Sequence, residues 1–212
     1  VSVAPEEPGA MEFISQVAED VNVAVAHTTA DYDTALEAFR RGARQVTHLF
    51  NAMPNFTHRA PGVVGAALDS PWSRVELICD GIHIHPSVVR AVFKMFGPDR
   101  VVLISDTMRA AGMTDGKYDL GGQEVTVKGP LATLADGTIA GSVTDLMACL
   151  KTAVSFGIPL ADAVRAAAVN SAQAIGVFDR VGSLEPGKRA NVVVLDGELN
   201  VKNVFFHGKQ VV

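Results

Sequence analysis

Short apolar runs alternate with helical patterns through the first half of the chain. Five runs are rich in Val, Ile and Leu, as buried strands are, and they cover residues 1–4, 21–26, 44–50, 74–79 and 100–105. Between them, apolar residues recur at helical spacing in residues 10–20, 32–41, 63–68 and 87–96. Because strands and helices alternate and several strands are apolar on both faces, the pattern predicts a parallel sheet covered on two sides.

The pattern changes after Asp106. Residues 117–139 alternate between polar and apolar positions and contain Gly-Gly and Asp-Gly, which predicts a flap of β-hairpins. Three further helices are predicted at residues 142–156, 159–169 and 170–175. The tail from residue 181 is all β, so we expect it to pack separately from the helices before it.

Composition and charge narrow the class of protein. The chain has 212 residues, 48% of them hydrophobic and 19% charged, which is typical of a soluble globular protein. Its net charge of −5 includes no basic block, which argues against nucleic acid and anionic membranes as partners. No apolar run is long enough to span a bilayer and the first residues lack a signal peptide, so we expect a cytoplasmic protein. The chain lacks an initiator Met, so we expect a fragment.

Polar residues stand where the predicted strands stop. Glu6, His27 and His48 follow the first three strands at intervals of one strand–helix unit, and Asp106 follows the fifth. The carboxyl ends of the strands in a closed parallel barrel face one mouth, so these side chains are expected to converge. One carboxylate and two imidazoles suit Zn²⁺ or Fe²⁺, which would acidify a bound water. Asp106 would then be the general base.

A structural interpretation competes with this one. A single histidine at a strand end is more often a hydrogen-bonded structural residue than a metal ligand, so the metal hypothesis depends on three residues in register. His58, His85 and His207 lack this spacing, and we expect His85 to begin the helix at Pro86. Cys79 and Cys149 are isolated in apolar segments and are expected to be buried, reduced thiols.

Several motifs together resemble the N-acetylglucosamine-6-phosphate deacetylases of the amidohydrolase superfamily. They are VAPE, AHT, THLFNAMP, THRAPG, DGIH, SDTM, GTIAGS and GSLEPGKRANVVVLD, and they run over nearly the whole chain. THLFNAMP with its arginine loop and DG-x-H is specific to the deacetylases. The resemblance implies an α/β fold, a (β/α)8 TIM-type barrel whose strands four to eight make up residues 1–178. Residues 179–212 would be part of a small β-sandwich domain.

The resemblance also implies roles for individual residues. Glu6, His27 and His48 match the ligands of a divalent metal ion, Zn or Fe, and Asp106 matches the catalytic aspartate. The positions that match substrate-binding residues are Asn51, Ala52, Arg59, Asp80, His83, Ile139, Ala140 and Gly141. Asn51 and Ala52 would meet the substrate's phosphate, and Arg59 would reach it from the neighbouring subunit of a homodimer. Arginine suits this role because its planar fork pairs with phosphate oxygens.

This chain departs from the family pattern at three points. The second-ligand motif usually reads GHS where this chain has AHT, and the catalytic motif usually ends in Ala where this chain has Thr107. Both changes leave the reactive side chains intact and bear on substrate preference. The first three barrel strands of a full member, which decide between one metal and two, are absent from this chain.

Three functions remain open at this point. The leading hypothesis is a metal-dependent deacetylase that converts N-acetylglucosamine 6-phosphate to glucosamine 6-phosphate and acetate. The second is another amidohydrolase, acting on a cyclic amide or a nucleobase, although a neutral ring needs no phosphate cradle. The third is a non-catalytic part-barrel that binds a partner or self-associates through its exposed sheet edges.

Overall fold

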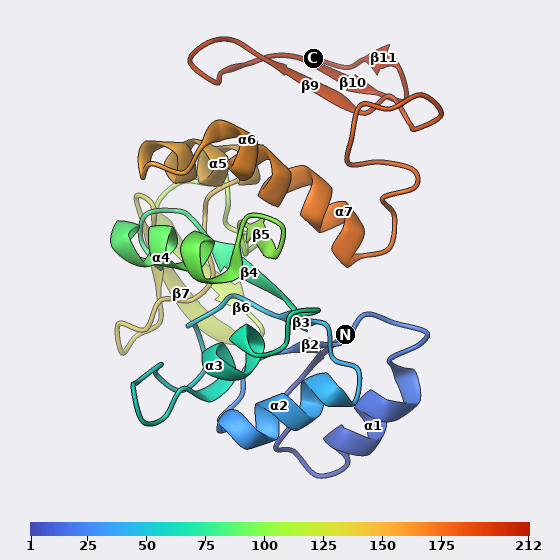
Figure 1. Ribbon diagram of the computed structural model, residues 1–212. Coiled ribbons are helices and arrows are strands. Elements are labelled where there is room, and N and C mark those ends of the chain that lie inside the picture. Colours follow the sequence, from blue (N-terminus) through green and yellow to red (C-terminus); the bar gives the residue numbers. More distant parts are fainter.

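The computed structural model describes residues 1–212, and its main sheet has five parallel strands in the order β1-β2-β3-β4-β5. This confirms the predicted parallel sheet. The strands are β1 (Ser2–Val3), β2 (Ala24–Val25), β3 (Gln45–Val46), β4 (Arg74–Ile78) and β5 (Val101–Ile104). The helices that connect them are α1 (Ala10–Val17), α2 (Tyr32–Arg40), α3 (Gly62–Leu68) and α4 (Pro86–Phe96) (Figure 1).

Local chemistry explains where these helices begin and end. The Asp31 side chain accepts a hydrogen bond from the Thr34 backbone amide at 2.9 Å and caps α2. His85 caps α4 as predicted, because its ring nitrogen accepts from the Ser87 backbone amide at 3.2 Å. Gly42, with φ of 116°, ends α2, and a Cβ there would lie 2.4 Å from the Cβ of Ala18. Only glycine therefore lets α2 end this close to α1.

The main core lies between the sheet and its helices. It contains 30 buried residues, and Ile14, Phe39, Leu49 and Leu77 are among its largest fully buried side chains. The two cysteines are buried and free, as predicted. Burial raises the pKa of the Cys79 thiol to about 12 and that of Cys149 to about 11, so both stay protonated near neutral pH.

The predicted flap is a separate antiparallel sheet. It consists of β6 (Gly116–Leu120), β7 (Gln123–Lys128) and β8 (Leu131–Thr133). Its own small core contains Met108, Ala110, Val125, Val127, Ala132 and Ala140. Two of these residues, Met108 and Ala140, belong to the segments that enter and leave the flap, so its core reaches back towards the end of β5.

One helical layer packs against β5. Its elements are α5 (Leu146–Ser155), α6 (Leu160–Val164), the π-helical turn η1 (Arg165–Val169) and α7 (Asn170–Ala174). The helix predicted from Ser142 starts at Leu146 instead, because residues 142–144 hydrogen-bond to the segment after β5. The two helices predicted for residues 159–175 form one continuous segment. The buried Asn170 holds it in place by donating to the Pro98 and Val101 carbonyls, both at 2.7 Å.

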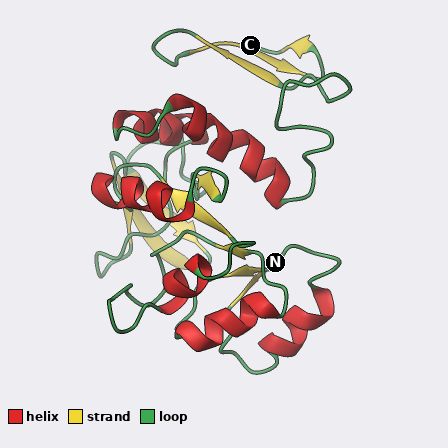
Figure 2. Ribbon diagram, viewed as in Figure 1, coloured by secondary structure: helices red, strands yellow, loops and turns green.

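The tail forms the predicted third sheet. Its strands are β9 (Val192–Leu195), β10 (Val201–Phe206) and β11 (Lys209–Gln210), in the order β11-β10-β9. Figure 2 shows this sheet apart from the rest of the molecule, joined to it by the loop that follows α7. Lys151 in α5 donates to the Asn200 side chain at 2.8 Å and ties the two parts together. None of the helices has the length and apolar character that crossing a membrane requires.

Candidate active site

Unusual backbone conformations gather at the carboxyl ends of the strands. Seven residues other than glycine have a positive φ, and five of them follow β2, β3 or β5. These five are His27 (47°), His48 (32°), Phe50 (75°), Ala52 (48°) and Asp106 (50°). L-residues rarely adopt this left-handed region, and such strain clusters at functional sites. β2 and β3 are shorter than the predicted runs, and the backbone turns away two residues after each of them ends.

The two histidines meet as the sequence predicted. The Nε2 atoms of His27 and His48 lie 3.0 Å apart, and the two rings are arranged edge to face. His48 is only 5% exposed, and its Nδ1 is buried without a hydrogen-bond partner. Buried polar atoms without partners are uncommon. If Nδ1 carries the proton, the Nε2 lone pair of His48 points at His27.

Glu6 is bonded to Thr28 and Thr29, the two residues that follow His27. Its carboxylate accepts hydrogen bonds from the hydroxyl of Thr28, the backbone amide of Thr29 and, at 3.1 Å, the Thr29 hydroxyl. Burial by itself raises the pKa of Glu6, but these donors outweigh it and the net pKa is lowered. Glu6 is therefore ionised near neutral pH and is held by the two residues that follow His27.

These residues suit a divalent metal in part. No three His, Cys, Asp or Glu side chains are close enough to hold an ion together. Two nitrogens on one tetrahedral Zn²⁺ would lie about 3.3 Å apart, close to the observed 3.0 Å between His27 and His48. The donor set of two imidazoles and a carboxylate fits zinc or iron, provided that Glu6 exchanges its threonine partners for the ion.

The loop after His48 is hydrogen-bonded to the loop after β2. The Asn51 side-chain amide donates to the carbonyls of His48 (3.2 Å) and Leu49 (3.3 Å), so it closes its own loop. The Ala52 carbonyl accepts from the Thr28 backbone amide at 3.0 Å. A hollow of about 430 Å³ lies beside this junction and is lined by His27, Thr28, Thr29, Ala52, Met53 and Pro54. Arg59 is exposed on the following loop and forms no ion pair.

Asp80 and His83 form a buried pair after β4. The His83 Nδ1 lies 2.7 Å from Asp80 Oδ2, while Asp80 Oδ1 accepts from the backbone amides of Ile82 and His83 at 2.9 Å. Burial alone raises the pKa of Asp80, but the His83 ring and the two amides lower it further than burial raises it. The ionised Asp80 accepts a hydrogen bond from the Nδ1–H of His83, so Nε2 carries the lone pair and can accept a further hydrogen bond.

Asp106 lies at the end of β5 next to the flap. Its side chain is exposed and has no hydrogen-bond partner, while its carbonyl accepts from the Ser142 amide at 2.9 Å. The predicted flap segment Ile139–Gly141 leads directly into this bond. Ile139 is exposed, Ala140 is buried in the flap core, and Gly141 has a positive φ of 63°.

Several residues with clear contacts at the site escaped the sequence analysis. Thr28 and Thr29 hold Glu6, and Ser142 holds the backbone around Asp106. Glu76 is partly buried in β4 and accepts a hydrogen bond from the Gln45 side chain. A charged residue within the apolar run RVELIC was the only sequence signal for Glu76.

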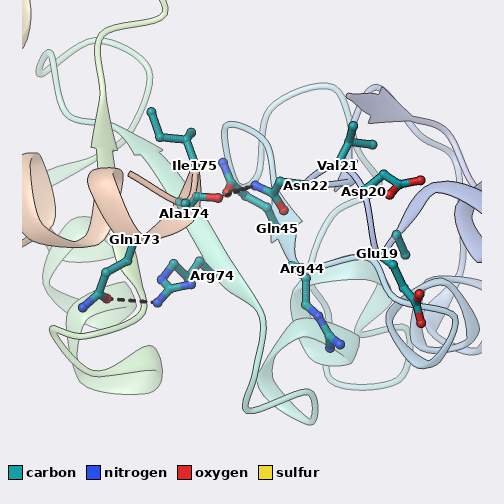
Figure 3. A pocket seen from close by; sticks show the side chains of 12 residues that line it. Glu19, Asp20, Val21, Asn22, Arg44, Gln45, Arg74, Gln173, Ala174 and Ile175 are labelled. Carbon is teal, nitrogen blue, oxygen red and sulfur yellow. Dashed lines mark hydrogen bonds between the residues drawn. The ribbon is translucent and has the colours of Figure 1, made fainter. Parts of the chain in front are cut away.

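A second hollow of about 330 Å³ lies at the opposite, amino-terminal ends of the strands. Figure 3 shows Asn22 bonded to Gln45 and Arg74 bonded to Gln173 in its wall. In (β/α)8 barrels, residues at the amino-terminal face serve stability and residues at the carboxyl face carry the chemistry. This second hollow therefore plays no part in the candidate site.

Parallel strand–helix repeats with polar residues gathered at the carboxyl ends of the strands are typical of the (β/α)8-barrel class. The chain belongs to the Amidohydrolase family, which matches residues 3–211. The expected TIM-type α/β fold is thereby confirmed.

Named relatives are similar over the whole chain. N-acetylglucosamine-6-phosphate deacetylase of Bacillus subtilis (strain 168) is 40% identical over 203 residues, which are 95% of this chain and 51% of the relative. N-acetylgalactosamine-6-phosphate deacetylase of Escherichia coli O157:H7 is 38% identical over 211 residues, 99% of this chain and 56% of the relative. The chain therefore spans about half the length of the curated relatives it matches.

A solved structure is equally similar. A mutant N-acetyl-D-glucosamine-6-phosphate deacetylase from Mycobacterium smegmatis, in complex with N-acetyl-D-glucosamine-6-phosphate, superposes with a TM-score of 0.96 at 40% identity. The match covers 100% of this chain and 57% of that one. The expected resemblance to these deacetylases is confirmed.

Proposed function

We propose that the protein carrying this chain is a metal-dependent deacetylase that hydrolyses N-acetylglucosamine 6-phosphate to glucosamine 6-phosphate and acetate. The observation that carries the proposal is the pair of ring nitrogens, His27 Nε2 and His48 Nε2, 3.0 Å apart at a rim of strained strand ends. The named relatives support the same substrate class, because each acts on an N-acetylated amino-sugar 6-phosphate according to its name.

Glu6, His27 and His48 would hold the divalent ion. Deacetylases of the amidohydrolase family generally use a divalent metal, and the donor set here favours zinc or iron. When bound, such an ion supplies Lewis acidity, which lowers the pKa of a coordinated water and polarises an amide carbonyl. The hydrogen bonds from Thr28 and Thr29 keep Glu6 ionised, so it is ready to act as a ligand.

Asp106 would move the proton. Amide hydrolysis adds the oxygen of water to the acetyl carbon, breaks the C–N bond and requires a proton on the departing nitrogen. An exposed carboxylate without a partner of its own can take the water's proton and pass it to that nitrogen, so Asp106 suits both steps.

The remaining predicted residues would bind substrate. The free Nε2 of His83 can accept a hydrogen bond from the sugar, and Asp80 acts through His83 by fixing its orientation. Asn51, Ala52 and Arg59 would meet the phosphate, and Ile139–Gly141 would cover the sugar. We also propose that Arg59 acts across a homodimer and that the protein is cytoplasmic.

The other two hypotheses receive less support. A cyclic amide or nucleobase substrate would leave the arginine loop without a role, and the named relatives act on amino-sugar phosphates. A non-catalytic part-barrel would not need three left-handed residues at the predicted reactive positions.

The first prediction concerns acetate release. The protein, in its full encoded length and loaded with Zn²⁺ or Fe²⁺, is assayed with N-acetylglucosamine 6-phosphate, its galactosamine epimer and unphosphorylated N-acetylglucosamine. We expect acetate from a phosphorylated sugar only. Asp106→Asn should lower kcat by about 10²- to 10⁴-fold while the metal stays bound, because proton transfer is lost. His48→Ala should lose the metal, and His207→Ala in the tail should keep both metal and activity.

Two outcomes would contradict the proposal. Full turnover by metal-loaded Asp106→Asn would remove Asp106 from the reaction. Acetate release that is equal with and without the phosphate group would remove the phosphate-binding role of the loop after His48.

A further inference from the structure

The flap and Asp106 are joined by a short clasp of hydrogen bonds centred on Ser142. The Ser142 backbone amide donates to the Asp106 carbonyl at 2.9 Å, and the Met108 amide donates to the Ser142 carbonyl at 2.9 Å. The Ser142 hydroxyl donates to the Ser105 carbonyl. Ser142 thus bonds to Ser105 before Asp106, to Asp106 itself and to Met108 after it.

The surroundings of Ser142 make this clasp rigid. Ser142 is only 2% exposed, so its hydrogen bonds are shielded from competing water. The Thr107 hydroxyl adds a bond to the Thr144 carbonyl at 2.7 Å. At Gly141, where φ is 63°, a Cβ would lie 3.4 Å from the Asp106 carbonyl, so the two segments run in close contact.

Asp106 needs such support because its own φ is 50°. A left-handed backbone at a residue other than glycine is uncommon and is sustained by the structure around it. The clasp supplies that hold, since it fixes the peptide groups on both sides of Asp106. The clasp also reaches the flap, because Met108 and Ala140, in the segments that enter and leave the flap, are buried in the flap core.

We propose that Ser142 is a positioning residue that holds the Asp106 backbone in its left-handed conformation and couples it to the β6–β8 flap. The inference rests on the proposed function in so far as Asp106 transfers the proton. Movement of the flap would then be transmitted to the Asp106 carboxylate through Ser142, and the reactive geometry would depend on the position of the flap.

The test compares three variants of the full-length, metal-loaded protein. Ser142→Ala removes the hydroxyl, and Ser142→Thr retains it. Ser73→Ala is the matched control, because Ser73 is a fully buried serine at the opposite end of the sheet that donates to the Ala67 carbonyl at 3.1 Å. We expect Ser142→Ala to lower kcat by about 10- to 100-fold, a range typical of residues that orient a reactive group, with KM little changed. Ser142→Thr should recover most of kcat, and Ser73→Ala should keep it.

Amide hydrogen exchange gives a second measurement that does not need activity. In Ser142→Ala, the amides of Met108 and Ser142 and those of the flap strands should exchange faster, on the order of tenfold, whereas Ser73→Ala should leave them unchanged. Unchanged exchange at these amides would overturn the coupling. A kcat of Ser142→Ala within twofold of the wild type would overturn the positioning role, as would failure of Ser142→Thr to restore kcat. Wild-type protein that releases no acetate would refute the proposed function, while the exchange experiment would still decide the clasp.

Discussion

At the residue scale, the site is marked by backbone strain more clearly than by side-chain contacts. His27, His48 and Asp106 share a left-handed conformation that costs each of them on the order of 1–3 kcal/mol. Hydrogen bonds around them offset that cost, notably from Ser142 to Asp106 and from Leu49 to the Glu76 carbonyl at 2.8 Å. The chain therefore holds its candidate reactive groups in place before any ligand binds.

Asp80→Asn tests the orientation of His83. An asparagine can still accept from the backbone, but it is neutral and cannot bind the Nδ1 proton of His83 as strongly. We expect kcat in the full-length protein to fall by about 10- to 100-fold. Asp33→Asn, an exposed change in the first turn of α2, serves as the control. Unchanged kcat in Asp80→Asn would show that the Asp80–His83 pair has no part in turnover.

The same variant has a predictable effect on stability. The pKa of Asp80 is lowered in the folded protein, so its ionised form stabilises the fold above the ordinary aspartate pKa of about 3.9. That contribution is lost as the pH falls through the lowered pKa. Asp80→Asn should therefore be less stable than the wild type at pH 7, and the difference should shrink in acid. Urea unfolding from pH 7 to pH 3 measures both, and a difference that is constant with pH would contradict the ionised pair.

At the scale of elements, β4 carries a charge where its neighbours carry apolar residues. Glu76 lies among the buried residues of β4 and accepts from the Gln45 side chain, which in turn accepts from Asn22 at 2.9 Å. Burial raises the pKa of Glu76, and the negative charge of Asp106 raises it too, while Gln45 and the His48 amide lower it by less. Asn22, Gln45 and Glu76 thus form a chain of hydrogen bonds that runs across the sheet to β4.

Glu76→Gln should remove the cost of burying that charge. A raised carboxyl pKa means that the folded state binds its proton more tightly than the unfolded chain, so stability falls as the pH rises above about 4.3. Glutamine is nearly isosteric and can still accept from Gln45. We expect the variant to gain free energy of unfolding relative to the wild type between pH 4 and pH 7, with Glu7→Gln, an exposed site, as a flat control. A loss that is the same at every pH would contradict this account.

At the scale of the whole molecule, the chain joins the five-stranded parallel sheet and its flap to the small antiparallel sheet of the tail, β9–β11. The apolar side chains of Leu184, Val193 and Phe206 are 81%, 54% and 58% exposed in or next to the small sheet. The small sheet therefore buries little of its own apolar surface, whereas the main sheet has a core of 30 residues. Stability should be unevenly divided between these two parts.

We propose that the chain divides into two parts between residues 178 and 179, and limited proteolysis tests this division. Brief digestion should cut the loop between α7 and β9 first and release a fragment near residues 1–178, because no residue of that loop is buried. Mass spectrometry of the products locates the cut. First cuts within α2 or β4 would mean that the two parts do not separate there.

The sequence alone predicted the order of strands and helices, the hairpin flap, the β-strands of the tail and the meeting of His27 with His48. Periodicity is enough to predict the elements. The spacing of the two histidines is enough to predict that they meet, because the carboxyl ends of parallel strands share one rim. Only the tertiary structure decided that Glu6 bonds to Thr28 and Thr29, that Asp80 pairs with His83 and that Ser142 clasps Asp106. The contacts of Glu6 and Ser142 join segments distant in sequence, whereas Asp80 and His83 lie three residues apart in one loop. All three depend on backbone conformations that no local pattern specifies.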